Sequence, residues 1–184
     1  EAAVVNTLSA GDTVAVVRAG KFGERWVEIA RAYGVNVIEL VAPFGASVAP
    51  ARVEEALAKT PGVKAVLTQH SESSTGVLHD VRSYAAITAR FPAILIVDAV
   101  SSLGIADLPM DAWGVDVVVA GSQKGLMLPP GLAFCALSEK AWATTKTSAL
   151  PKYYFDLPKE RQANAKNDVR FTPAVSIVVG LREV

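Results

Sequence analysis

An acidic side chain and an amine each follow a short apolar run in the middle of the chain. Asp98 comes directly after Ile94–Val97, and Lys124 lies in the turn Gly121–Gly125 that follows Val115–Ala120. Both runs are rich in β-branched residues and bounded by turn-forming residues, so each predicts a buried strand. Ligand groups gather at the carboxyl ends of strands in open α/β sheets. We therefore expect Asp98 and Lys124 to lie at one site.

A carboxylate and an amine are the two groups that pyridoxal 5′-phosphate requires of a protein. Its aldehyde forms a Schiff base with a lysine, and its ring nitrogen needs an anionic partner to stay protonated, so that the ring can accept electrons. Taken alone, Lys124 also fits an ordinary surface lysine. Asp98 also fits a helix N-cap or a loop carboxylate. The positions of both residues after apolar strands favour the cofactor site.

Four sequence blocks extend this interpretation, and they occur in a fixed order: Ser71–Leu78, Val97–Gly104, Gly121–Lys124 and Pro129–Gly131. In this order they resemble the class V aminotransferases of the alanine/serine–glyoxylate (or pyruvate) group, which are fold-type I pyridoxal-phosphate enzymes. The similarity extends more loosely over nearly the whole chain. Any one block would be a weak signal, whereas four blocks in order are specific.

The resemblance implies a role for each residue around the cofactor ring. Lys124 forms the Schiff base, and its released amine moves the proton between the substrate Cα and the cofactor. Asp98 pairs with the ring nitrogen. Val100 packs on one face of the ring, and Phe22 stacks on the other, where the family often has Trp. The alternative for Val100 and Phe22 is ordinary core packing, since Phe22 also fits the apolar face of a predicted helix.

Three further residues match polar positions of the family. Ser73 resembles the serine that hydrogen-bonds the cofactor near its ring hydroxyl, and Gln123 resembles the residue that reaches the phosphate. Thr172 resembles a residue that contacts the phosphate of the neighbouring subunit's cofactor, although Val169 stands where some relatives carry a phosphate-binding Tyr. The alternative for Ser73 and Gln123 is turn chemistry, in which side chains satisfy loop backbone groups.

Other reactive side chains fit competing chemistries less well. His70 and His79 lack Cys or acidic partners at metal-binding spacing, so no metal site is expected. Cys135 lies within an apolar run, which favours a small core residue over a nucleophile. Cysteine desulfurases share the implied fold but carry His before the Schiff-base lysine, where this chain has Gln123.

Composition excludes several classes of function. The net charge is zero over 184 residues, so no electrostatic footprint for nucleic acid or an anionic membrane is present. No apolar run approaches the ~20 residues of a membrane span, and no secretory signal pattern is found. A single Cys fits a reducing compartment. We therefore expect a soluble, cytoplasmic protein.

Predicted strands and helices alternate along the chain. The predicted strands are Thr13–Arg18, Val35–Leu40, Val63–Thr68, Ile94–Val97, Val115–Ala120 and Leu132–Leu137. The predicted helices are Phe22–Tyr33, Ala51–Lys59, Asp80–Phe91 and one that starts at Ser138, whereas residues 144–170 are expected to be a loop-rich connection. This alternation predicts an α/β fold in three α-β-α layers with a mostly parallel sheet. The fold-type I resemblance adds one antiparallel strand, which we expect at the reversal around Lys124.

Residues 1–184 are expected to form one pyridoxal-phosphate-binding large domain that is cut at both ends. Helical spacing begins at Glu1 without an N-cap, and a second helical pattern from Thr172 is still running at Val184. The resemblance implies a Gly/Ser/Thr-rich phosphate loop before residue 1. It also implies a smaller C-terminal domain, with the arginine that binds the substrate carboxylate, after residue 184.

The predicted function is a pyridoxal-phosphate-dependent transaminase. By resemblance it transfers an amino group from a small amino acid, alanine or serine, to glyoxylate or pyruvate, and works as a homodimer with sites at the interface. One alternative is a non-catalytic relative or fragment that keeps the fold and serves as a binding or assembly subunit. Another is a different class V enzyme, such as a desulfurase or lyase.

Overall fold

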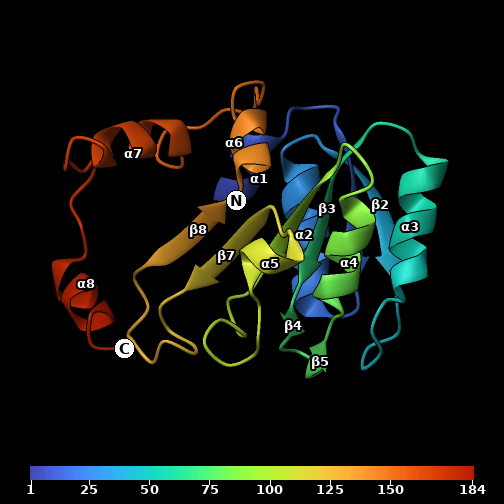
Figure 1. Ribbon diagram of the computed structural model, residues 1–184, viewed down its shortest axis with the longest axis horizontal. Helices are drawn as coiled ribbons and strands as arrows, with labels where there is room; N and C mark the ends of the chain where they lie inside the picture. Colours follow the sequence, from blue (N-terminus) through green and yellow to red (C-terminus); the bar gives the residue numbers. More distant parts are fainter.

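Six strands form one mixed, mostly parallel sheet in the order β2-β1-β3-β6-β7-β8 (Figure 1). The structure is a computed structural model that describes residues 1–184. The strands of this sheet are β1 (Thr13–Arg18), β2 (Asn36–Val41), β3 (Val63–Gln69), β6 (Ile94–Asp98), β7 (Val117–Gly121) and β8 (Ala133–Leu137). Their inner residues are mainly apolar and β-branched, as expected for a parallel sheet covered on both faces.

One strand runs against the others, as predicted. β7 pairs in parallel with β6 but antiparallel with β8, with Val117 opposite Leu137 and Gly121 opposite Ala133 (Figure 1). The chain therefore reverses between Gly121 and Ala133, and Lys124 lies inside this reversal. The remaining pairs of the large sheet are parallel, so the carboxyl ends of β1, β3, β6 and β7 share one edge.

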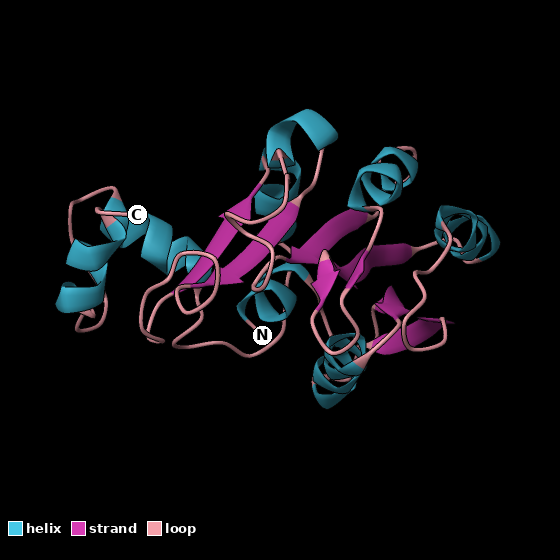
Figure 2. Ribbon diagram, turned by 90° about the horizontal axis from the view of Figure 1, so that it is seen from below, coloured by secondary structure: helices cyan, strands magenta, loops and turns pink.

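Helices cover both faces of the sheet, which gives the predicted three layers (Figure 2). One face packs against α1 (Ala2–Thr7), α2 (Lys21–Ala32) and α6 (Glu139–Thr144). The other packs against α3 (Pro50–Lys59), α4 (Val81–Thr88) and α5 (Met110–Trp113). Two more helices, α7 (Leu157–Asn164) and α8 (Val175–Leu181), lie beyond the β8 edge (Figure 1). Each helix of the structure is too short or too polar to span a lipid bilayer.

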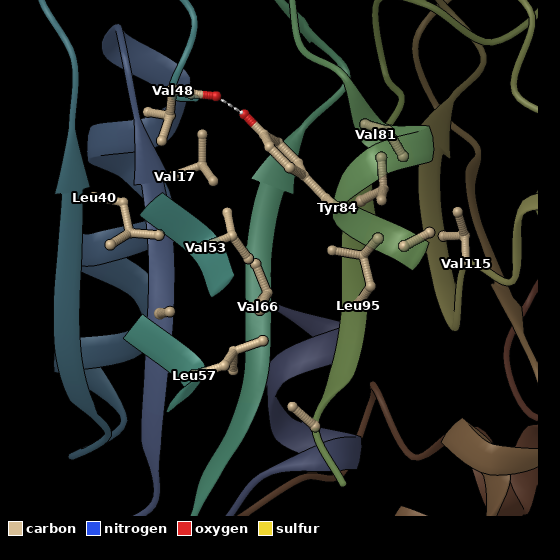
Figure 3. Packing of buried hydrophobic residues seen from close by; sticks show 14 of the residues in the cluster. Val17, Leu40, Val48, Val53, Leu57, Val66, Val81, Tyr84, Leu95 and Val115 are labelled. Carbon is tan, nitrogen blue, oxygen red and sulfur yellow. Dashed lines mark hydrogen bonds between the residues drawn. The ribbon is translucent and has the colours of Figure 1, made fainter. Parts of the chain in front are cut away.

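Apolar side chains of the strands interlock with those of α3 and α4 on the second face. Figure 3 shows Val66 and Leu95 of the sheet facing Val53 and Leu57 of α3 and the fully buried ring of Tyr84. The Tyr84 hydroxyl donates a hydrogen bond to the carbonyl oxygen of Val48, so its one polar atom is satisfied. This packing fixes the strands whose ends carry the predicted site.

Two parts of the chain differ from the sequence prediction. The predicted loop-rich connection, residues 144–170, contains α7, whose N-terminus is capped by the Asp156 carboxylate through the amide of Lys159. No residue of α7 is buried, so this helix has no apolar stripe from which to predict it. The Ser/Thr-rich segment after β3 forms a small antiparallel hairpin, β4 (Ser71–Glu72) and β5 (Val77–Leu78).

Candidate active site

A cavity of about 370 Å³ opens beside the carboxyl ends of β6 and β7. It brings together six of the seven residues predicted for the cofactor site: Phe22, Ser73, Asp98, Val100, Gln123 and Lys124. They come from α2, from the β4–β5 hairpin, from the last residue of β6 and from the segments that follow β6 and β7. Residues far apart in the sequence thus meet at one sheet edge, as the topology of open α/β sheets leads us to expect.

Asp98 is the last residue of β6 and presents a largely desolvated carboxylate to the cavity. Its side chain accepts one hydrogen bond, from the amide of Val100, at 2.8 Å. Burial raises the pKa of Asp98 above its usual range. The negative charge of Glu72 acts in the same direction, while the Val100 hydrogen bond opposes them. Such a carboxylate would be stabilised by a cationic group placed beside it.

Lys124 lies in the turn after β7, and its side chain is exposed at the cavity. The ten ion pairs of the chain include neither Lys124 nor Asp98. Gly125 holds this turn close to the loop after β6, because a Cβ added there would overlap the carbonyl oxygen of Leu103. The turn therefore needs glycine at this position in order to deliver the amine.

Apolar groups form part of the cavity wall. Val100 and Val119 are half-buried, and so is Phe22 at the start of α2. The guanidinium of Arg25 lies over the Phe22 ring, 5.3 Å from its centroid, and also lines the cavity. The indole N–H of Trp26, another lining residue, is buried without a hydrogen-bond partner. Apolar and aromatic side chains of this kind offer contact surface for a planar ring.

Polar side chains line the cavity on the hairpin side. The Ser73 hydroxyl donates a hydrogen bond to the Ser101 hydroxyl at 2.5 Å, which ties the β4–β5 turn to the loop after β6. Ser71 lines the same cavity, and Gln123 is exposed beside Lys124. The structure thus places the exposed side chains of Ser73 and Gln123 at the cavity, within the set of residues that can face a ligand.

Thr172 does not line this cavity. It is exposed and lies three residues before the start of α8 at Val175. Its predicted partner is a cofactor in a neighbouring subunit, so its role stays a prediction.

The two histidines are buried outside this cavity. The Nδ1 atom of His70 is 3.0 Å from the Ser102 hydroxyl, and the Nε2 atom of His79 is 3.3 Å from Nε2 of Gln69. Burial lowers the pKa of both histidines, which favours the neutral imidazole near pH 7. Both are buried polar residues that flank the hairpin, His70 directly before β4 and His79 directly after β5.

The sequence-based reasoning missed several residues around the cavity. Arg25, Ser71 and Ser101 line it, and the spacing of Arg25 from Phe22 on one helix could have indicated this for Arg25. Glu72, which is fully buried behind the lining residues, was also missed. A carboxylate predicted on a Ser/Thr-rich turn is normally solvated, so its burial could not be foreseen from its neighbours.

Comparison with known proteins matches residues 2–184 to the family model described as aminotransferase class-V. The chain is similar to the soluble hydrogenase 42 kDa subunit of Anabaena cylindrica, with 48% identity over 98% of this chain and 48% of that protein. It is 42% identical to an L-aspartate–glyoxylate aminotransferase of Paracoccus denitrificans, over 98% of this chain and 47% of that protein. A solved alanine–glyoxylate aminotransferase from Nostoc sp. matches with a TM-score of 0.91 and 29% identity, covering 99% of this chain and 49% of that one. The chain thus spans about half the length of these relatives.

Proposed function

The chain belongs to the class-V aminotransferase family, and from this premise we propose that it forms the cofactor-binding domain of a pyridoxal-phosphate-dependent transaminase. The reaction would transfer an amino group from a small amino acid, such as alanine or serine, to glyoxylate or pyruvate. The names of the Paracoccus and Nostoc relatives support glyoxylate as the acceptor. The observation that carries the proposal is that the Asp98 carboxylate and the Lys124 amine line one cavity, and that neither is a member of any of the ten ion pairs of the chain.

The residues present fit pyridoxal phosphate. Asp98 is a desolvated carboxylate with a raised pKa and a single hydrogen bond, so a protonated ring nitrogen would supply a cation in direct contact with it. Lys124 offers a primary amine that makes no ion pair, as a lysine that condenses with an aldehyde requires. Phe22 and Val100 offer apolar surfaces for the ring.

Pyridoxal phosphate, when bound, supplies an electron-poor ring that stabilises the negative charge left on a substrate Cα after its proton departs. The amine of Lys124 would hold the cofactor and, once released, carry the proton to and from Cα as a general base and acid. Asp98 would keep a proton on the ring nitrogen through its negative charge. The side chains of Phe22 and Val100 would orient the ring and exclude water from its faces.

The rest of the working protein is also a proposal. Ser73 and Gln123 would hydrogen-bond the cofactor at its ring hydroxyl and phosphate. The active form would be a homodimer in which Thr172 lies near the phosphate held by the neighbouring subunit. A cytoplasmic enzyme fits the single, half-buried Cys135, which needs no disulfide partner.

A second function is an assembly subunit that keeps the fold and binds cofactor without transamination. The observation that favours it is the name of the Anabaena relative, a subunit of a soluble hydrogenase. The two functions differ in their response to substrate, because only a transaminase converts an amino acid to its keto acid.

A spectroscopic experiment on the protein as expressed from its own gene separates these functions. Pyridoxal phosphate is added and the visible absorption band of the lysine-bound cofactor is recorded; alanine, serine or aspartate is then added, and glyoxylate only after that. Loss of the band with formation of the keto acid on amino-acid addition, and return of the band with formation of glycine on glyoxylate addition, support the transaminase. An absorption band that no amino acid changes supports the assembly subunit, and the absence of any band refutes the cofactor site.

A further inference from the structure

The helix that carries Phe22 has no cap from its own sequence. The N-cap residue of α2 is Gly20, which has no side chain to accept hydrogen bonds from the first turn. Four amides at a helix start lack intrahelical partners and need other acceptors when they are buried. In α2 these acceptors come mainly from the β4–β5 hairpin, about 50 residues further along the chain.

The carboxylate of Glu72 provides most of this distant cap. Its Oε2 atom accepts hydrogen bonds from the amides of Phe22 at 3.1 Å and Gly23 at 3.0 Å. The hydroxyl of Ser74 accepts a hydrogen bond from the Lys21 amide at 3.0 Å and donates one to Oε1 of Glu72 at 2.6 Å. The Glu24 amide makes the first intrahelical bond, to the Gly20 carbonyl oxygen at 3.0 Å, so the hairpin satisfies the three amides that precede it in α2, those of Lys21, Phe22 and Gly23.

The environment of Glu72 requires two acceptor oxygens. The Ser74 amide and hydroxyl both face Oε1, at 3.3 Å and 2.6 Å, while the amides of Phe22 and Gly23 face Oε2. A glutamine at this position would place its NH2 group against N–H donors in either orientation of its amide. The side chain is 0% exposed, so water cannot replace a lost bond.

Gly20 completes the arrangement. A Cβ at Gly20 would lie 2.5 Å from Cγ of Glu72 and 2.5 Å from the Ser74 hydroxyl, so a side chain there would displace the carboxylate. The first turn of α2 is therefore capped by the buried Glu72 carboxylate of the hairpin and not by a side chain of its own. This contact holds the start of α2 against the hairpin.

Both ends of this contact reach the cavity. Phe22, whose amide Glu72 binds, lines the cavity from α2, and Ser73, the residue after Glu72, lines it from the hairpin. Ser73 in turn donates a hydrogen bond to Ser101 in the loop after β6. One buried carboxylate thus connects the two elements on which Phe22 and Ser73 are carried.

We propose that Glu72 is a positioning residue, which fixes Phe22 relative to Ser73 and so preorganises the cleft for the planar ring of the cofactor. This inference rests on the proposed function of the cavity. When the carboxylate is lost, the start of α2 loosens and the competent cleft becomes a minor population. The apparent Kd of the cofactor rises by the inverse of that population.

The test uses Glu72→Gln in the protein as expressed from its own gene, with three measurements. They are far-ultraviolet circular dichroism for folding, a spectrophotometric titration for the pyridoxal phosphate Kd, and visible circular dichroism of the bound cofactor for the orientation of its ring. A competent population of about one in ten would raise the Kd about tenfold. The visible dichroic signal per bound cofactor should also change, whereas a purely structural role would leave it unaltered.

The matched control is Asp116→Asn. Asp116 is also a buried carboxylate, bonded to the Leu95 amide at 3.0 Å and the Ser138 hydroxyl at 2.9 Å, but it does not line the cavity. This variant should lose stability and keep the wild-type Kd and dichroic signal. An equal rise in Kd for both variants would overturn the inference, because it would reflect general destabilisation.

Ser74→Ala is the second variant, since Ser74 is exposed and its loss should leave the fold intact. It removes one bond to Glu72 and one to Lys21, so a two- to threefold rise in Kd is expected, a fraction of the effect at Glu72. If Glu72→Gln does not fold, the Kd and dichroic signal of Ser74→Ala test the role of Glu72 in its place. An unchanged Kd and dichroic signal in the folded variants would refute the role of Glu72. A wild-type protein that binds no cofactor would refute the proposed function instead.

Discussion

Replacing Asp98 by Asn removes the charge that we assign to the cofactor ring nitrogen and keeps the shape of the side chain. The asparagine oxygen can still accept the hydrogen bond from the Val100 amide. No other acidic side chain lines the cavity except Glu1, so the ring nitrogen would lose its close anionic partner. Opposite charges in contact move a pKa by ~1–3 units, so the ratio of protonated to neutral ring would fall by ~10- to 1000-fold.

The assay is a single-turnover reaction of the cofactor-loaded protein with the amino donor. We expect the rate of the Asp98→Asn variant to fall by about 10- to 1000-fold, while cofactor attachment at Lys124 persists. A rate within about twofold of wild type, with cofactor fully bound, would refute the assignment of Asp98 to the ring nitrogen.

The Asp98→Asn substitution should lower the reaction rate but raise the stability of the cofactor-free protein. Burial raises the pKa of Asp98, so the folded state holds its proton more tightly than the unfolded state, whose carboxyl titrates near ~3.9. The contribution of Asp98 to the free energy of unfolding is therefore complete in acid and is lost as pH rises through the folded-state pKa. Asn does not titrate, so the variant should gain stability relative to wild type between acid and neutral pH. Urea unfolding at several pH values checks this, and a gain that shrinks toward neutral pH would contradict it.

Three further predictions concern the cavity walls and the cysteine. Phe22→Leu should raise the cofactor Kd by about 2- to 10-fold in a spectrophotometric titration, because an aromatic pair contributes ~0.5–1.5 kcal/mol beyond area burial; an unchanged Kd would mean that Phe22 does not stack. Gly125→Ala should lower the free energy of unfolding by ~1 kcal/mol or more and weaken cofactor attachment, because the new Cβ overlaps the Leu103 carbonyl oxygen; wild-type stability in urea would contradict this. Burial raises the pKa of Cys135 to about 11, so little of the reactive thiolate is present at about pH 8. A disulfide reagent should therefore modify Cys135 at least ~100-fold more slowly than a free cysteine. Rapid labelling of the folded protein would be inconsistent with the burial of this thiol.

Much of the fold follows from local sequence patterns. The β-branched runs that became β1, β3 and β6 are bounded by turn residues, and a parallel sheet buried on both faces needs such runs. Two helix starts could also be predicted from their capping residues. Asp80 caps α4 through the amide of Ser83, and Ser138 caps α6 through the amide of Ala141. The reversal at Lys124 was expected from the family resemblance and is confirmed by the antiparallel β7–β8 pair.

The parts that could not be predicted depend on distant contacts or on the absence of an apolar pattern. Glu72 caps a helix 49 to 50 residues earlier in the chain, and nothing in the sequence around the N-cap residue Gly20 indicates this contact. Helix α7 has no buried residue, so hydrophobic periodicity does not reveal it. For the candidate site, strand-end position was enough to group Asp98 with Lys124, whereas Ser71 and Ser101 entered the cavity through tertiary packing.

The central claim is that Lys124 and Asp98 serve one cofactor site, and a covalent label tests it most directly. The protein is incubated with pyridoxal phosphate, reduced with borohydride, digested, and its peptides are analysed by mass spectrometry. We expect the reduced cofactor on the peptide that contains Lys124, a weaker yield at that peptide in Asp98→Asn, and no label in Lys124→Ala. Specific labelling of another lysine, or a label that persists in Lys124→Ala, would contradict the claim.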